Sequence, residues 1–432
     1  MSDSQSSPAS QPSGSPEVWG RRRFLAAVLS GAATLILQAC GRERRVIPPD
    51  PTAIPATATA APAARQSQYM PLVANQHRAA TTRTPVPTEA PTAVPAEPPP
   101  PTSTTPAPTA TSRPPATPFP PGPPSKLGVF LGYHHPQLFD LLSTGNIALV
   151  KTLEYNADFV ASIKRVSPNT VVIARYTPLE QFNLAAADPA EAARRFADLI
   201  LPIATDPVRQ ANIDAWEAYN EPVPAGHEQM ARLAAFEAER TRLLAAAGIR
   251  SCIGNFGTGQ PALEQWPAFF PAIQAIQEHN GYLGLHEYSA PYLWFGTGAY
   301  QFQPGVDEGD EGWLTLRYRK VYRQYLQPAG LEVPLLITET GIDGSVANRP
   351  GPAGSGWRDF RGFWQSEGRV TSSAAGFYVE QLTWYDAELA QDPYVKGAAI
   401  FALAGPQGWE SFEMLGECAR ILQQYLAVHP RG

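Results

Sequence analysis

Residues 213–220, IDAWEAYN, are followed at 227–248 by HEQMARLAAFEAERTRLLAAAG, and these two segments together indicate the fold. The first is a short apolar run of the kind that forms a buried strand. In the second, apolar residues from Met230 to Leu244 recur at the spacing of one helix face, and Gly248 supplies a stop. A strand followed by an amphipathic helix is one βα unit.

The same pattern recurs along the chain. Seven further strand-like runs lie at 127–133, 147–155, 170–176, 250–257, 282–289, 334–341 and 397–405. Further helical stretches lie at 189–200, 266–280, 313–326 and 419–429. Eight such strands in about 300 residues predict an α/β fold of the (β/α)₈ or TIM barrel type. An open doubly wound sheet is the alternative, but the first strand-to-helix turn, GYHHPQLFD at 132–140, has no Gly-rich phosphate loop.

Three regions differ in composition, and we predict a signal peptide with a lipobox at 1–40, a disordered Pro-rich linker at 41–125 and a catalytic domain at 126–432. Half of the 46 prolines lie between Pro48 and Pro124. Such a tract cannot bury enough apolar surface to offset the entropy of ordering it, so we expect an extended spacer.

The N-terminal region has features of an export signal. Arg21-Arg22-Arg23-Phe24-Leu25 precedes an apolar run that ends at Cys40 and is shorter than the ~20 residues of a membrane-spanning helix. The first motif resembles a bacterial twin-arginine signal, and Leu37-Gln38-Ala39-Cys40 resembles a lipobox. We therefore expect an exported, extracytoplasmic lipoprotein held at the membrane through lipidated Cys40. An uncleaved anchor or an ordinary signal peptide is the alternative.

Charge and cysteine usage limit the classes of partner. Residues 126–432 hold 23 Lys and Arg against 33 Asp and Glu, and this acidic balance without a basic stripe argues against nucleic-acid binding. Only Cys252 and Cys418 remain in this region, too few for a disulfide framework. No His/Cys cluster has metal-ligand spacing, so we expect no metal. No Gly-x-Ser-x-Gly elbow is present, which disfavours Ser/His/Asp chemistry. We also expect no cofactor and a monomer.

Polar residues end most of the predicted strands. In chain order they are Tyr133, His134, Glu154, Arg175, Asn220, Glu221, Asn255, His286, Tyr288 and Glu339. In a (β/α)₈ barrel these strand ends share one cleft. Glu221 and Glu339 end strands four and seven, which face each other across a barrel of eight. Glycoside hydrolysis needs two carboxyl groups placed in this way.

These residues carry a resemblance to a known family. The segments YNEP at 219–222 and ITETG at 337–341 resemble those of the clan A glycoside hydrolases, retaining β-glycosidases with a (β/α)₈ fold. The resemblance implies that Glu221 is the acid/base, that Glu339 is the nucleophile and that Asn220 binds the sugar 2-hydroxyl. The segment LHEY at 285–288 resembles the strand-six motif of that clan, in which the tyrosine, here Tyr288, orients the nucleophile.

The chain departs from the clan pattern at two strands. Many members end strand eight with a tryptophan, whereas here the strand runs through Phe401 and Trp409 follows only in the loop. Many also carry an arginine near the end of strand two, where this chain has Lys151-Thr152-Leu153-Glu154, and the nearest arginine candidate is Arg175.

We therefore expect a glycosidase (EC 3.2.1.-) that acts on β-linked oligosaccharides or polysaccharides. The residues expected to contact the sugar are Asn220, His286, Tyr288, Arg175, Glu154, Asn255, His134 and Trp409. Glu287 is expected to point away from the cleft and Trp216 to lie in the core. Two other functions stay open, a catalytically inactive barrel that binds carbohydrate at the cell surface and a different barrel hydrolase with the same carboxylates. Taken alone, Asn220-Glu221-Pro222 also fits the first turn of a helix.

Overall fold

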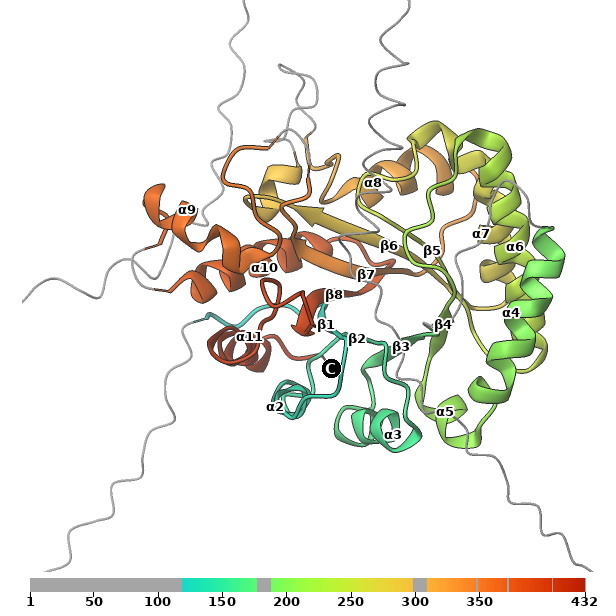
Figure 1. Cartoon of the computed structure of the whole chain (residues 1–432), viewed down its shortest axis with the longest axis horizontal. Helices are drawn as coiled ribbons and strands as arrows, with labels where there is room; N and C mark the ends of the chain where they lie inside the picture. The colour runs from blue at the N-terminus through green and yellow to red at the C-terminus, as the bar shows by residue number, and fades with distance from the viewer. Residues whose placement is uncertain are drawn as a thin grey trace, which may run out of the picture. The chain divides into compact units, whose positions relative to one another are not determined.

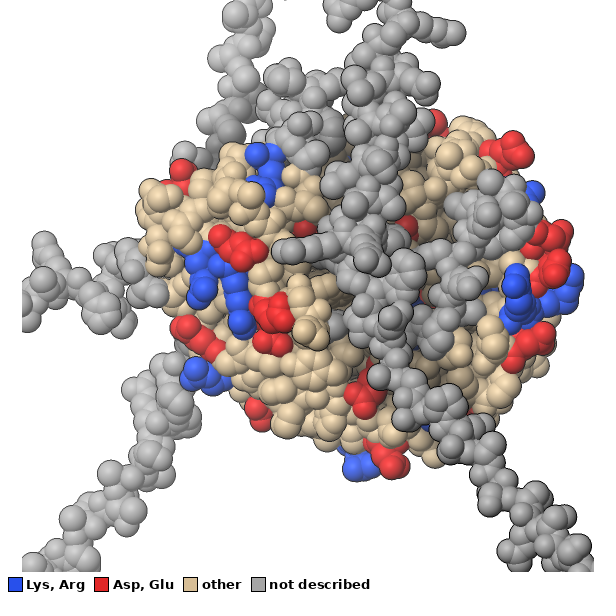
Figure 2. All heavy atoms as spheres, viewed as in Figure 1, with Lys and Arg blue, Asp and Glu red and all other residues tan. Residues whose placement is uncertain are grey.

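The computed structural model describes residues 119–176, 188–297, 309–346, 349–370, 373–405 and 407–431. The predicted signal segment with Cys40 and nearly all of the predicted linker lie outside the described residues. Within the part that is described, no helix is both long and apolar enough to cross a membrane. On the face shown in Figure 2, acidic and basic side chains are mixed.

Eight parallel strands form the centre of the domain (Figure 1). They are β1 (Leu127–Leu131), β2 (Leu149–Thr152), β3 (Val171–Arg175), β4 (Ala215–Glu217), β5 (Cys252–Phe256), β6 (Tyr282–Ser289), β7 (Leu335–Ile342) and β8 (Val395–Ala404). Their order is β4-β3-β2-β1-β8-β7-β6-β5. A parallel bridge between Trp216 and Ser251 joins β4 to β5, and the Trp216 N–H donates to the Arg250 carbonyl at 3.1 Å. The strands therefore form a (β/α)₈ barrel, as the sequence predicts.

Ten α-helices of the described chain lie around the strands (Figure 1). They are α2 (Gln137–Leu142), α3 (Ala157–Val166), α4 (Pro189–Ala204), α5 (Pro207–Asn212), α6 (Gly226–Ala246), α7 (Trp266–Glu278), α8 (Arg317–Val321), α9 (Arg361–Ser366), α10 (Ala374–Leu389) and α11 (Glu417–Ala427). A π-helical turn, Tyr322–Leu326, extends α8, and short 3₁₀ turns span Leu263–Gln265, Leu293–Gly296 and Trp357–Phe360.

Capping residues fix where several helices begin. The Asn156 side chain accepts from two backbone N–H groups at the start of α3. Asp188 and Asp206 cap α4 and α5, each just before a proline in the first turn. A short polar side chain followed by proline is a strong helix start.

Helix α10 has no counterpart among the helices expected from the sequence. Its buried residues include Ala374, Tyr378, Gln381, Tyr385 and Leu389. Polar and aromatic side chains are thus buried along with aliphatic ones, so no single apolar stripe is visible in the sequence.

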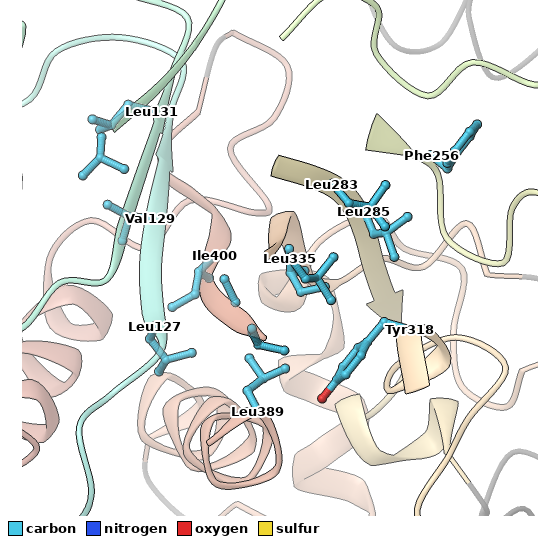
Figure 3. Close-up of a cluster of buried hydrophobic side chains, with 14 of the residues drawn as sticks. Leu127, Val129, Leu131, Phe256, Leu283, Leu285, Tyr318, Leu335, Leu389 and Ile400 are labelled. Atoms are coloured by element: carbon cyan, nitrogen blue, oxygen red, sulfur yellow. The ribbon is translucent and has the colours of Figure 1, made fainter. Parts of the chain in front are cut away.

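Alternation along each strand divides the core into two clusters. On β1, Leu127, Val129 and Leu131 pack outward beneath the helices, and Figure 3 shows them with Ile400 of β8. Phe130, between them, packs inside the barrel. Successive side chains of a strand point to opposite faces, so the same rule decides which polar residues enter the barrel.

The last residues of the predicted linker pack against the domain. The Phe119 ring meets Tyr425 of α11 edge-on at 5.4 Å, and the Gly122 N–H donates to the Val428 carbonyl at 3.1 Å. A Cβ atom at Gly122 would lie 2.2 Å from the His429 ring, so a larger residue there would require the ring to move. The packed domain therefore includes residues from Phe119 onward, ahead of Lys126.

Candidate active site

Strand alternation turns a set of polar side chains into the barrel. On β2, Leu149 belongs to the inner cluster and Val150 to the outer one, so Lys151 points inward. On β4, Ala215 packs inside and Trp216 outside, and Glu217 follows inward. The same alternation places Arg175, His286 and Tyr288 at inward positions of β3 and β6, towards the carboxyl ends of their strands.

Glu339 enters the barrel because β7 carries one extra residue. The adjacent residues Leu285 and His286 of β6 pair with Ile337 and Glu339 of β7, which leaves Thr338 without a partner in this register. Regular alternation from Ile337, which packs in the outer cluster, would place Glu339 outside the barrel. The bulge corrects that orientation, and bulges often reorient side chains beside active sites.

Glu339 is surrounded by donors and cations. Its Oε1 atom lies 3.0 Å from Lys151 Nζ and 3.7 Å from an Arg175 guanidinium nitrogen. Its Oε2 atom accepts a hydrogen bond from the Tyr288 hydroxyl at 2.8 Å. The side chain is 7% exposed. Both carboxylate oxygens are thus held in place from several strands.

These neighbours keep Glu339 ionised. Burial on its own raises the pKa of the Glu339 carboxyl, but the surrounding positive charges and the hydrogen bond from Tyr288 outweigh it, and the pKa lies well below its usual range. The residues that lower it, in order of effect, are His286, Lys151 and Arg175. An ionised carboxylate at neutral pH is what a nucleophile requires.

Glu221 lies in the turn after β4. Its φ of 48° is in the left-handed region, and its N–H donates to the Asn255 carbonyl at 3.0 Å. A Cβ atom at Gly257 would lie 3.3 Å from the Glu221 carboxyl carbon, so the missing side chain there leaves room for the carboxyl group. The Glu221 side chain is 25% exposed, more than that of Glu339.

His286 contacts both glutamates. Its Nδ1 atom lies 2.9 Å from Glu221 Oε1 and 3.6 Å from Glu339 Oε2. The ring is buried, and its Nε2 atom has no hydrogen-bond partner among the described residues. The His286 ring is therefore within hydrogen-bonding distance of Glu221, and its position fixes both carboxyl groups relative to each other.

Asn220 and Arg175 form a second contact at the site. An Arg175 guanidinium nitrogen donates to Asn220 Oδ1. Because Arg175 also approaches Glu339, this contact links the turn after β4 to the end of β7. Six of the predicted residues are thereby joined in one network: Arg175, Asn220, Glu221, His286, Tyr288 and Glu339.

The side chains of three other predicted residues make their hydrogen bonds outside that network. The Glu154 carboxylate accepts from the backbone N–H of His134 at 2.8 Å, and the His134 ring packs against Phe159 of α3. The Asn255 side chain is fully buried and accepts from the Thr338 hydroxyl at 3.0 Å. These contacts indicate that Asn255 has a structural role in the barrel, below the site.

Trp409 approaches the site through a second aromatic ring. It packs on Phe401 of β8 at 4.6 Å between ring centroids, and Phe401 meets Tyr288 at 6.1 Å. Phe401 thus lies in the inner cluster beside Tyr288, and half-buried Trp409 packs on Phe401. Glu287 and Trp216 lie as expected. The Glu287 side chain is buried on the outer side of β6, and Trp216 packs in the outer core cluster.

Lys151 and Glu217 were not among the predicted site residues. Lys151 Nζ lies 3.0 Å from Glu217 Oε2 as well as from Glu339 Oε1, and both Lys151 and Glu217 are fully buried. Each is a single charge within an otherwise apolar strand run, in LVKT and AWE. A charge within an apolar strand run is the sequence feature that could have identified these two residues, because a buried charge needs a partner of opposite sign.

One set of side chains has the proximity of metal ligands. One potential ligand atom each from Glu221, His286 and Glu339 lies within 4.8 Å of the others. However, Lys151 and Arg175 already supply positive charge to Glu339, which disfavours a further cation at this carboxylate. The donor set fits proton transfer better than metal binding.

A hollow of about 580 Å³ lies at the opposite, amino-terminal end of the strands. Lys126, Arg250, Tyr282 and Lys396 are among the residues that line it. Neither Glu221 nor Glu339 lines this hollow. The candidate active site is therefore at the carboxyl ends of the strands, where both glutamates lie.

No protein-family model matches the sequence, and no curated protein matches it. Among solved structures, the chain is similar to a GH128 (subgroup II) endo-β-1,3-glucanase from Sorangium cellulosum, with 16% identity, a TM-score of 0.39, and coverage of 71% of this chain and 100% of that one. It is also similar to CJP38, a β-1,3-glucanase and pollen allergen of Cryptomeria japonica, with 18% identity, a TM-score of 0.41, and coverage of 71% and 98%.

A third similar structure is the β-glucuronidase of Ruminococcus gnavus, with 13% identity and a TM-score of 0.43. The match covers 70% of this chain and 49% of that one. These likenesses concern the fold, and the function is argued below from the site itself.

Proposed function

We propose that this protein is a retaining glycoside hydrolase that cleaves β-glycosidic bonds of an oligosaccharide or polysaccharide. The observation that carries the proposal is the pairing of Glu221 and Glu339. Carboxylate oxygens of the two residues lie within 4.8 Å of each other. Retaining glycosidases hold their two carboxyl groups about 5–5.5 Å apart, whereas inverting enzymes leave room for a water molecule between them.

The environments of the two glutamates favour different roles. Glu339 is buried and held ionised, which suits attack on the anomeric carbon. Glu221 is more exposed and lies 2.9 Å from His286 Nδ1, which suits proton transfer to a leaving group and later from water.

The reaction then has two steps. In the first, a Glu339 carboxylate oxygen bonds to the anomeric carbon, the glycosidic C–O bond breaks with its electron pair on the leaving oxygen, and Glu221 protonates that oxygen. In the second, Glu221 takes a proton from water, water attacks the anomeric carbon, and the Glu339 carboxylate is released. Tyr288 and Lys151 hold Glu339 in both steps, and Asn220 is positioned to bind the sugar 2-hydroxyl.

The proposal is tested by digestion of a glycan panel with the wild type, followed by mass spectrometry of the products. Glu339→Ala is the inactive comparison. Glu332→Ala, at an exposed position before β7, is the matched control and should behave as wild type. Binding of a glycan without release of products by the wild type would instead favour an inactive, carbohydrate-binding barrel.

We also propose that the protein is exported and anchored through Cys40, on the evidence of the sequence motifs alone. Metabolic labelling with a fatty-acid analogue should mark the wild type and leave Cys40→Ala unmarked and unprocessed. Equal labelling of both proteins would exclude the lipoprotein assignment.

A further inference from the structure

Lys151 is a single buried cation between two carboxylates. Its Nζ atom lies 3.0 Å from Glu339 Oε1 and 3.0 Å from Glu217 Oε2, and its side chain is fully buried above the Phe130 ring. In this resting arrangement, one positive charge is shared by two negative charges.

The ion pair with Lys151 is the contact that explains the burial of Glu217. Apart from the contact of Oε2 with Lys151 Nζ, neither of its oxygens has a hydrogen-bond partner among the described residues, and its side chain is fully buried. Its ion pair with Lys151 is therefore the contact that compensates its charge. A buried carboxylate with a single compensating contact is costly, so a role in function is a more economical explanation than one in stability.

The proposed reaction supplies such a role. When Glu339 bonds to the anomeric carbon, its carboxylate becomes an ester and loses its negative charge. Lys151 would then face a neutral group in a dry interior, with no countercharge from β7. Glu217 lies below the site and does not react, so its carboxylate stays beside Lys151 in both steps.

We propose that Glu217 is a positioning residue that holds Lys151 in place while Glu339 is esterified. This inference rests on the proposed function. Glu217 acts through Lys151, and its effect should be largest on formation of the covalent intermediate, the step in which Lys151 loses its second countercharge.

Other charged groups around this trio are accounted for. Arg175, His286 and Glu221 face Glu339, while Cys252 and the Glu237–Arg240 pair lie beside Glu217. Arg240 is bonded to Glu237 at 2.7 Å and donates to backbone carbonyls of β4 and β5, so it does not substitute for Lys151.

The test measures the two chemical steps separately, with a 2-deoxy-2-fluoro aryl β-glycoside of the sugar that the panel identifies. The rate of inactivation reports formation of the Glu339 ester, and the rate of reactivation reports its hydrolysis. Glu217→Gln should form the ester at least ~10-fold more slowly and should reactivate at least as fast as wild type. The acid limb of kcat/KM should move to lower pH, because Lys151 then pairs with Glu339 alone and lowers the pKa of Glu339 further.

Two further variants keep the inference falsifiable if Glu217→Gln folds poorly. The double variant Lys151→Met/Glu217→Gln leaves no unpaired cation, so the ratio of the two rates should return towards wild type while the acid limb moves to higher pH. Asp392→Asn, which breaks a buried ion pair with Arg319 outside the barrel, should leave that ratio unchanged.

An equal change of both rates in Glu217→Gln, or an unchanged acid limb, would overturn the inference, as would a ratio that stays altered in the double variant. Failure of the proposed function looks different, because the wild type itself would then form no ester at Glu339.

Discussion

Glu221 and Glu339 come from different strands, yet their carboxylate oxygens lie within 4.8 Å of each other, and the two side chains differ in exposure, at 25% and 7%. Proximity allows both to act on one bond. Unequal burial and unequal charge around them allow one to stay ionised while the other exchanges a proton.

Removal of the acid/base should depend on the leaving group. Glu221→Ala should lower kcat/KM by about 100-fold or more for glycosides with poor leaving groups, because their departure needs a proton. An activated aryl glycoside should be affected far less in the first step. The measurement is a series of aryl glycosides with leaving groups of graded pKa. A uniform loss along the series would contradict the role given to Glu221.

Tyr288 is expected to set the lower end of the pH range. Its hydroxyl donates to Glu339 at 2.8 Å and favours the ionised form, so Tyr288→Phe should raise the pKa of Glu339. Activity requires ionised Glu339 and is present above that pKa, so the acid limb of kcat/KM should move to higher pH. We expect a loss of about 10- to 100-fold at neutral pH. An acid limb at the wild-type position would exclude this role.

Glu287, on the outer side of β6, should make stability depend on pH. Burial raises its pKa to about 7, although Tyr385 and the N–H groups of Tyr318 and Leu316 donate to it. Between its unfolded pKa and about 7 the folded state binds more protons, so the free energy of unfolding falls as pH rises, by about 3 kcal/mol in all.

Glu287→Gln should flatten this part of the curve, since the amide is neutral throughout. Urea unfolding at pH 5 and pH 8 measures the difference. An identical slope in wild type and variant would show that Glu287 is not its source.

The segment ahead of β1 should contribute to stability and not to catalysis. Removing residues up to 124 deletes the Phe119 contact with Tyr425 and the hydrogen bond from Gly122 to Val428. We expect a loss of about 1–2 kcal/mol and full activity at moderate temperature, because these residues lie at the end of the barrel opposite Glu339. A protein beginning at Phe119 is the matched comparison, and equal melting temperatures would show that the contacts contribute nothing.

Much of the fold follows from local sequence pattern. Eight apolar runs with polar ends predict the strands and one shared cleft, and this rule brings Glu221, His286 and Glu339 to the same end of the barrel. Helix α10 could not be predicted in this way, because its buried residues include Gln381 and Asp386 as well as apolar ones.

Other features depend on the register of the strands. The extra residue at Thr338, which turns Glu339 inward, leaves no mark in the sequence. The same holds for Asn255, whose buried amide accepts from Thr338. Lys151 and Glu217 could be noticed as charges in apolar runs, but their partners depend on three strands that meet only in the closed barrel.

The most direct test of the account identifies the residue that bonds to the sugar. The wild type is treated with a 2-deoxy-2-fluoro glycoside of its substrate sugar, digested, and mapped by peptide mass spectrometry. The two-step mechanism predicts a single adduct, on the peptide that contains Glu339. An adduct on another residue, or none on an enzyme that still hydrolyses the parent glycoside, would contradict it.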